Sequence, residues 1–208
     1  MESVTQIIYI FDLLGTLIFA ITGALRGIQK ELDFLGVIVF AGVVGCGGGM
    51  LRDSLIGATP AAALTDGYYL LICIIAGITV FFVGPKIESR KKLLIYLDAL
   101  GLGVFTSIGV AKASMYGCSQ VGQILCGVIT AVGGGMIRDV LSREIPAVLT
   151  SDIYATASIA GGIVFLFLKQ EGANTGILYL SCTMTVIFLR CWAINNNLRL
   201  PKSRIYKK

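Results

Sequence analysis

Long runs of apolar residues follow one another along most of the chain, separated by short polar segments. A helix needs about 20 apolar residues to cross the hydrocarbon core of a bilayer. Five runs near this length contain no charged residue, and two more contain one aspartate each, Asp12 and Asp98. The pattern predicts an all-α integral membrane protein with seven transmembrane helices, at about residues 7–25, 34–56, 67–85, 94–112, 120–141, 153–169 and 174–193.

The basic residues are distributed unevenly between the two ends of these spans. All but three of the 17 Lys and Arg residues lie on one alternating set of ends, the exceptions being Arg52, Lys112 and Lys169. Cytoplasmic segments carry the excess of Lys and Arg, so we predict a cytoplasmic-membrane protein with its N-terminus outside and a basic cytoplasmic tail at 195–208. This topology and the lipid headgroups account for the net charge of +5, and no nucleic-acid partner is expected.

An internal repeat relates the two halves of the chain. Asp12 lines up with Asp98, and the same offset of 86 residues places Gly47–Asp53 on Gly133–Asp139 and Tyr68 on Tyr154 without a gap. Each copy holds three spans, so the second copy enters the membrane from the opposite side. We predict one membrane domain over 1–208, built as an inverted repeat (about 7–85 and 94–169) plus a seventh helix at about 174–193.

A triplet of glycines occupies the second span of each copy. Three consecutive glycines cost a helix about 2–3 kcal/mol relative to alanine and favour an interruption or kink. Inverted repeats with interrupted helices place a transport pathway between the copies, where freed backbone carbonyls could hold K⁺ or Na⁺. The alternative is that the glycines serve close helix packing. The candidate kink residues are Gly47, Gly48 and Gly49 with Gly133, Gly134 and Gly135.

An Arg-Asp pair follows each triplet by one helical turn. Ionisable residues at membrane depth indicate function, and an arginine there would set a positive barrier or gate that the aspartate neutralises. The alternative is a charged pair at the bilayer interface. Because Ser54 to Thr65 carries no charge, the first of these helices is expected to continue past its arginine. The pairs are Arg52-Asp53 and Arg138-Asp139.

Three further charged residues lie within or at the end of apolar spans. Asp12 and Asp98 either form structural ion pairs with an arginine of a neighbouring helix or line the pathway. Lys112 ends the fourth span, where it either anchors the helix at the interface or acts as a voltage- or gate-sensing charge.

The doubled Gly-Gly-Gly-x-x-Arg-Asp motif in a seven-span chain of about 200 residues resembles the prokaryotic trimeric intracellular cation (TRIC) channels, which are related to bacterial putative glycine transporters. The resemblance implies a homotrimer with a monovalent-cation pathway in each protomer, lined by the second and fifth helices kinked at their glycines. Lys112 stands where the family carries positive charge linked to voltage response. The lipid-binding signature of the animal members is not evident.

The composition argues against catalysis. The chain has no His, which removes the commonest general base and a common metal ligand, and its six cysteines form no C-x-x-C pair. We predict no enzyme activity and no cofactor, and a passive K⁺ channel in contact with membrane lipids. The alternative is a secondary transporter for glycine or another small amino acid, with the Arg-Asp pairs binding its two ends. A purely structural scaffold is the least favoured class.

Overall fold

The computed structural model describes residues 2–86, 90–150, 153–196 and 198, and every regular element in them is helical. The all-α prediction is confirmed. The predicted basic tail lies, from residue 199 on, outside the described residues. The long helices are α1 (Glu2–Gln29), α2 (Phe34–Leu55), α4 (Gly67–Val83), α5 (Arg90–Met115), α6 (Gln120–Leu141), α8 (Ala155–Gln170) and α9 (Thr175–Asn195), and the short ones are α3 (Ala62–Thr65), η1 (Gly84–Lys86) and α7 (Ala147–Thr150).

Six stretches of the described helices are long and apolar enough to cross a membrane, in α1, α2, α5, α6 and α9 and in α4 with the turn after it. The remaining long helix, α8, has 16 residues and spans about 24 Å, which is less than the usual hydrocarbon thickness. The prediction of seven spans therefore depends on α8.

Helix α2 continues past Arg52, as expected, and ends three residues later at Leu55, one residue before the predicted end at 56. Gly57 has a left-handed conformation (φ 75°), and the backbone N–H of Ala58 donates back to the carbonyl of Asp53 at 2.8 Å. This geometry is typical of a helix C-terminus with glycine just beyond the last turn. The uncharged stretch is therefore a loop followed by the single turn of α3.

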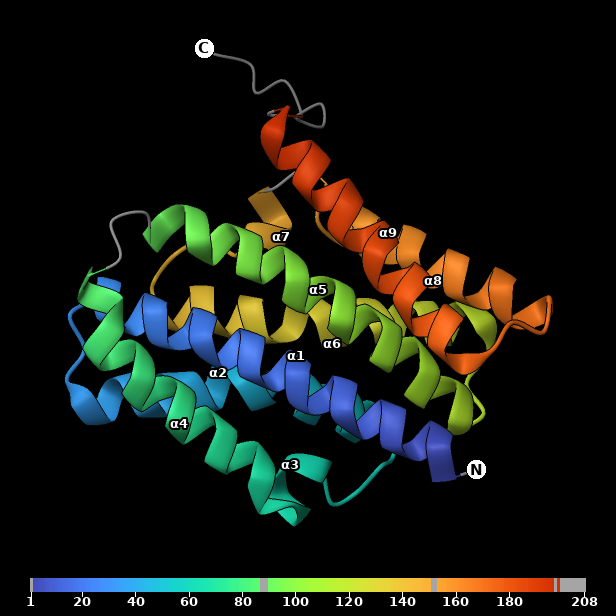
Figure 1. The fold of residues 1–208 in the computed structure, drawn as a ribbon, viewed down its shortest axis with the longest axis horizontal. Coiled ribbons are helices and arrows are strands. Elements are labelled where there is room, and N and C mark those ends of the chain that lie inside the picture. Colours follow the sequence, from blue (N-terminus) through green and yellow to red (C-terminus); the bar gives the residue numbers. More distant parts are fainter. Residues whose placement is uncertain (1, 87–89, 151–152, 197, 199–208) are drawn as a thin grey trace, which may run out of the picture.

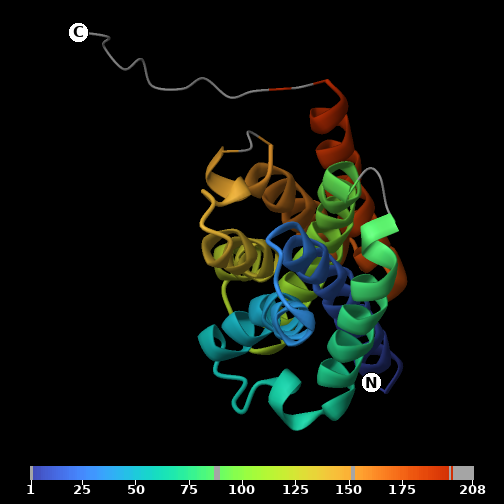
Figure 2. The ribbon, with the colours of Figure 1, turned by 90° about the vertical axis from the view of Figure 1, so that its left-hand side faces the viewer.

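The two copies pack as antiparallel counterparts. Figure 1 shows α1 and α5 side by side and running in opposite directions, and the two helices are in contact. Helix α4 packs on α1 and α2, whereas α8 packs on α5 and α6, and α9 covers α5 and α8. The end-on view in Figure 2 accordingly places α4 on one flank of the central helices and α8 on the other. The long contact between α2 and α6 joins the copies.

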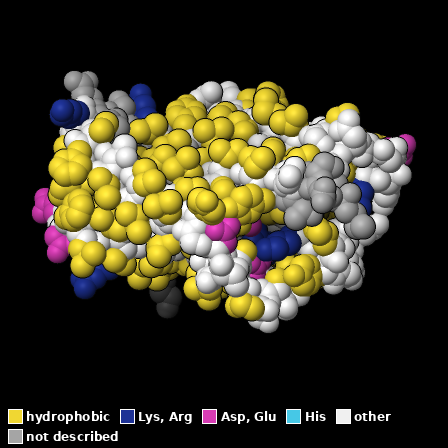
Figure 3. Space-filling view, turned by 60° about the horizontal axis from the view of Figure 1, so that its bottom comes forward, with side chains coloured by type: hydrophobic (Ala, Val, Ile, Leu, Met, Phe, Trp, Pro, Cys, Tyr) yellow, Lys and Arg dark blue, Asp and Glu magenta, His cyan; other side chains and the backbone are white. Residues whose placement is uncertain are grey.

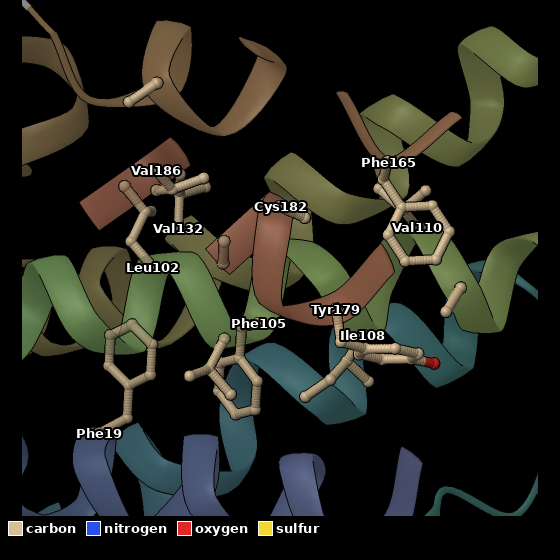
Figure 4. Packing of buried hydrophobic residues seen from close by; sticks show 14 of the residues in the cluster. Phe19, Leu102, Phe105, Ile108, Val110, Val132, Phe165, Tyr179, Cys182 and Val186 are labelled. Atoms are coloured by element: carbon tan, nitrogen blue, oxygen red, sulfur yellow. The ribbon is translucent and has the colours of Figure 1, made fainter. Parts of the chain in front are cut away.

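A symmetric aromatic contact lies where α1 meets α5. The rings of Phe19 and Phe105 stack with centroids 5.2 Å apart and planes 12° apart, and both side chains are fully buried (Figure 4). Each ring covers a glycine of the other helix: Phe105 lies over Gly15, and Phe19 over Gly101. The repeat therefore extends to packing, because each copy supplies both the ring and the small residue that receives it.

The outer surface is apolar over much of its area. Figure 3 shows hydrophobic side chains across most of one face and charged side chains at its ends. Within this face lies one small group that contains both acidic and basic side chains. Large apolar side chains are exposed on several long helices, for example Leu35, Leu70 and Phe188. Soluble monomers rarely expose such an area, so lipid or neighbouring subunits must cover it.

Candidate functional site: two charged networks around a glycine crossing

Helices α2 and α6 run unbroken through their glycine triplets, so the expected interruption is not found. Their backbones cross in close contact instead. A Cβ built on Gly134 would lie 2.5 Å from the carbonyl oxygen of Val44, and one built on Gly48 would overlap the carbonyl oxygen of Thr130. Any larger side chain would push the helices apart. The glycines therefore serve close packing, and a kink within a continuous helix stays a prediction.

The first charged network is centred on Arg52, whose side chain is 1% exposed. Its two terminal nitrogens donate to the two carboxylate oxygens of Asp12 at 3.1 and 2.9 Å, and its Nε donates to Asp53 at 2.8 Å. The hydroxyl of Tyr69 donates to Asp12 at 3.1 Å. Asp12 thus pairs with an arginine of the neighbouring helix, as one of the two sequence interpretations expected. The burial of Arg52 shows that this pair is not solvated at the protein surface.

Lys112 of α5 completes this network. Its Nζ donates to the Oδ1 atom of Asp53 at 2.8 Å, and the other oxygen of Asp53 accepts from the backbone N–H of Ala62 at 3.0 Å. Asp53 therefore ties the end of α2 to α5 and to the start of α3. Lys112 is held by a carboxylate, which differs from a lysine that only anchors a helix at the interface.

The second network repeats the first on the opposite side of the crossing. Arg138, also 1% exposed, donates to Asp98 at 2.8 Å, to Asp139 at 2.9 Å and to the hydroxyl of Thr22 at 3.2 Å. The hydroxyl of Tyr154 donates to Asp98 at 2.5 Å. A buried guanidinium between carboxylates is expected to be charged, because either partner alone would be an unpaired buried ion.

The two copies differ by one residue in the loop after the Arg-Asp pair. Asp53 accepts from the backbone of Ala62, nine residues on, whereas Asp139 accepts from Ala147 at 2.9 Å, eight residues on. The gap-free alignment is therefore wrong beyond this loop. In the first copy Tyr69 binds the aspartate, whereas Tyr68, which the sequence paired with Tyr154, is 62% exposed.

Two residues of the second side were not predicted as site residues. The guanidinium of Arg190 lies 4.4 Å from the centroid of the Tyr154 ring and donates to the carbonyl of Ile153 at 2.7 Å. Glu144 forms ion pairs with Arg26 at 3.0 Å and with Lys30 at 2.8 Å. The position of Arg190 at the end of an apolar run is the signal in the sequence that could have marked it as a site residue.

A cavity of about 460 Å³ opens on the second network. It lies among α1, α5, α6 and α9, and α7 also contributes to its wall. In the part of the chain that the structure describes, no group of three or more His, Cys, Asp or Glu side chains is arranged to hold a metal ion. The charged residues that line the cavity are Arg26, Asp98, Arg138, Asp139, Glu144 and Arg190.

These features define a class: multi-pass membrane proteins built from two copies of a three-helix unit that meet at a glycine crossing between two buried Arg-Asp networks. The family model described as "Glycine transporter" matches this chain twice, over residues 9–85 and 95–170. The chain belongs to that family.

Individual relatives agree with this assignment. A UPF0126 membrane protein of Vibrio cholerae is 41% identical over 204 residues, covering 98% of this chain and 85% of the relative. The solved structure of the TRIC channel orthologue from Rhodobacter sphaeroides matches with a TM-score of 0.90 and 33% identity, covering 93% of this chain and all of the other. A prokaryotic TRIC channel solved in 0.5 M KCl matches with a TM-score of 0.88 and 32% identity, over 94% and 100% of the two chains. The resemblance to prokaryotic TRIC channels is confirmed.

Proposed function

We propose that this protein is a passive channel for monovalent cations, K⁺ in particular, with a pathway inside each protomer along the crossing of α2 and α6. The similarity to cation channels over nearly the whole chain supports this function. The observation that carries it is the cavity of about 460 Å³ that ends at Asp98, Arg138 and Asp139. A cavity that leads to buried carboxylates at the junction of two inverted repeats is what an ion pathway requires.

The charge balance of the networks favours cations. Asp98 and Asp139 face a single guanidinium, that of Arg138, so this group carries a net charge of about −1 when all three are ionised. Carboxylates that line a pathway attract cations and repel anions. In the other network, Lys112 neutralises the corresponding charge. The cavity as a whole is lined by three acidic and three basic side chains, so the attraction for a cation is local to Asp98 and Asp139 at its inner end.

The glycine crossing keeps the pathway closed in this conformation. The backbones of α2 and α6 touch at Gly48 and Gly134, which leaves no room for an ion between them. Conduction requires the two helices to part there, by a bend or a small rotation at the triplets. Glycine permits such a change because it has no side chain and few backbone restrictions. The ion is bound by the flanking carboxylates, since the carbonyls of an unbroken helix accept bonds within it.

The assembly we propose is a homotrimer in the cytoplasmic membrane, with lipid around its apolar surface. The N-terminus lies outside and the C-terminus in the cytoplasm, which places the cavity on the cytoplasmic side. A pore performs no bond chemistry, so the function calls for neither enzyme activity nor a cofactor. Nucleic acid has no role in it.

Transport of glycine is the second candidate, because the family model bears that description. A transporter of this kind would use an arginine to bind the carboxylate of the amino acid. In the first network the three guanidinium nitrogens of Arg52 already donate to Asp12 and Asp53. A substrate would have to displace a buried ion pair, which favours the channel.

Planar-bilayer recording of the purified protein tests the proposal. In symmetric KCl we expect discrete unitary currents, and in a KCl gradient a reversal potential close to that of K⁺. The variant Asp98→Asn should lower the preference for K⁺ over Cl⁻, because it removes the excess negative charge. Silent bilayers together with saturable glycine uptake into liposomes would overturn the channel in favour of the transporter.

A further inference from the structure

The two ends of the pathway differ in one respect that the repeat does not predict. Lys112 lies on Asp53, where it neutralises the first network. Its counterpart at the same offset is Arg26, which would be expected to lie on Asp139. Arg26 instead pairs with Glu144 at 3.0 Å, and the cavity lies open beside Asp139.

The position of Glu144 is equivalent to that of Ala58 in the first copy. The backbone N–H of Ala58 donates to Asp53 at 2.8 Å, and that of Glu144 donates to Asp139 at 2.9 Å. In both copies the preceding residue has a left-handed conformation, with φ of 75° at Gly57 and 57° at Arg143. The backbones therefore match here, but alanine offers no carboxylate. One side-chain difference explains why only Arg26 is drawn away from its aspartate.

In the first copy, Lys112 occupies an acceptor position on Asp53. Asp139 has the equivalent acceptor position in the second copy. The Oδ1 atom of Asp53 accepts from both Arg52 and Lys112. Within the described residues, the Oδ1 atom of Asp139 accepts only from Arg138. Arg26 lines the same cavity as Asp139, and an arginine side chain reaches at least as far as a lysine.

We propose that Glu144 is a gating residue that holds Arg26 away from Asp139 and so keeps the cavity end of the pathway open. When this ion pair breaks, Arg26 moves to Asp139, fills the inner end of the cavity and neutralises the second network, as Lys112 does for the first. The inference rests on the proposed channel function and adds its regulation. It also explains why the two ends of a symmetric repeat differ in the same molecule.

Cysteine labelling measures the movement of Arg26 independently of ion flow. Ile194 of α9 lines the cavity, so Ile194→Cys reports its accessibility to a cationic thiol reagent, measured against the parent protein with its native cysteines. Adding Glu144→Gln should slow labelling about two- to fivefold, because the loss of a partly exposed ion pair shifts an equilibrium by about this factor. Adding Arg26→Ala as well should restore the rate. Lys30→Gln is the matched control, because it removes a partner of Glu144 but leaves Arg26 in place.

Recording of K⁺ currents completes the test. Glu144→Gln should lower the open probability by a similar factor, and Ala58→Glu should raise it by drawing Lys112 from Asp53. Unchanged labelling and currents in Glu144→Gln, with a conducting wild type, would overturn the gating role alone. Slow labelling that Arg26→Ala does not restore would also overturn it. If the wild-type protein carries no current, the channel proposal fails, while the labelling still decides whether Arg26 moves.

Discussion

Gly48 of α2 and Gly134 of α6 lie back to back, such that a Cβ built on Gly48 would be 3.3 Å from the backbone nitrogen of Gly134 and would overlap the carbonyl of Thr130. Gly48→Ala or Gly134→Ala should therefore force the helices apart. Overpacking of this kind costs about 1–3 kcal/mol, which we expect to see as a lower melting temperature in detergent.

Gly42 provides the matched control for these variants. It lies in the same helix, but a Cβ built there meets nothing within 4 Å. Gly42→Ala should leave stability unchanged or raise it by up to about 1 kcal/mol through helix propensity. If Gly48→Ala melts at the same temperature as Gly42→Ala, the close crossing is not what holds α2 against α6.

The tyrosines test which residue of the first copy corresponds to Tyr154. Tyr69→Phe removes a donor to the buried Asp12, as Tyr154→Phe does for Asp98. Each should lower the free energy of unfolding by about 1.5–3 kcal/mol, the range for a hydrogen bond to a charged group. Tyr68→Phe should have little effect because that side chain is exposed. A larger effect at Tyr68 would support the gap-free alignment of the repeats.

The sequence predicted the parts of the molecule that depend on local pattern. Apolar runs of bilayer length marked the long helices, and the doubled motif marked Arg52 and Arg138 as a related pair. A pairing of Asp12 with a neighbouring arginine was one of two alternatives, and it could be foreseen because a carboxylate among apolar residues needs a partner. The structure shows that pairing.

Other features depend on distances that a pattern does not contain. The glycine triplets predicted an interruption because helix propensity depends only on the local sequence. In the structure, the contact between α2 and α6 keeps both helices continuous. The extra loop residue before Ala62 shifts Tyr69 into the place expected of Tyr68. Glu144 stood in a loop with nothing to distinguish it until its pairing with Arg26 was visible.

Removal of Arg52 should be severely destabilising. Arg52→Ala leaves Asp12 and Asp53 buried without their main partner, and loss of one member of a buried ion pair costs about 3–5 kcal/mol. The double variant Arg52→Ala with Asp12→Asn should recover part of this loss, because only one carboxylate then remains charged. Chemical denaturation or thermal melting in detergent measures both. Equal stability of the single and double variants would show that Asp12 and Arg52 are not coupled.

Acidification should mimic Glu144→Gln. Glu144 lies in the loop after α6, where a hydrogen bond from Lys30, and then the charge of Arg26, holds the pKa of its carboxyl below its usual value of 4.5. A carboxyl whose pKa is lowered by folding contributes its stabilisation above its unfolded pKa and loses it as the pH falls through the folded pKa.

The Arg26–Glu144 pair should therefore be intact above about pH 4.5 and break below it. The charged groups that act on Glu144 are Lys30 in the turn after α1, Arg26 of α1 and Arg138 of α6. Protonation of the thiol slows labelling in both proteins as the pH falls. The rate at Ile194→Cys in the otherwise wild-type protein is therefore compared at each pH with the rate in Glu144→Gln, and it should fall further in this acidic range. In Glu144→Gln it should already be slow at neutral pH and change less, which separates Glu144 from Asp98 and Asp139. Parallel pH profiles in the two proteins would rule out Glu144 as the titrating group.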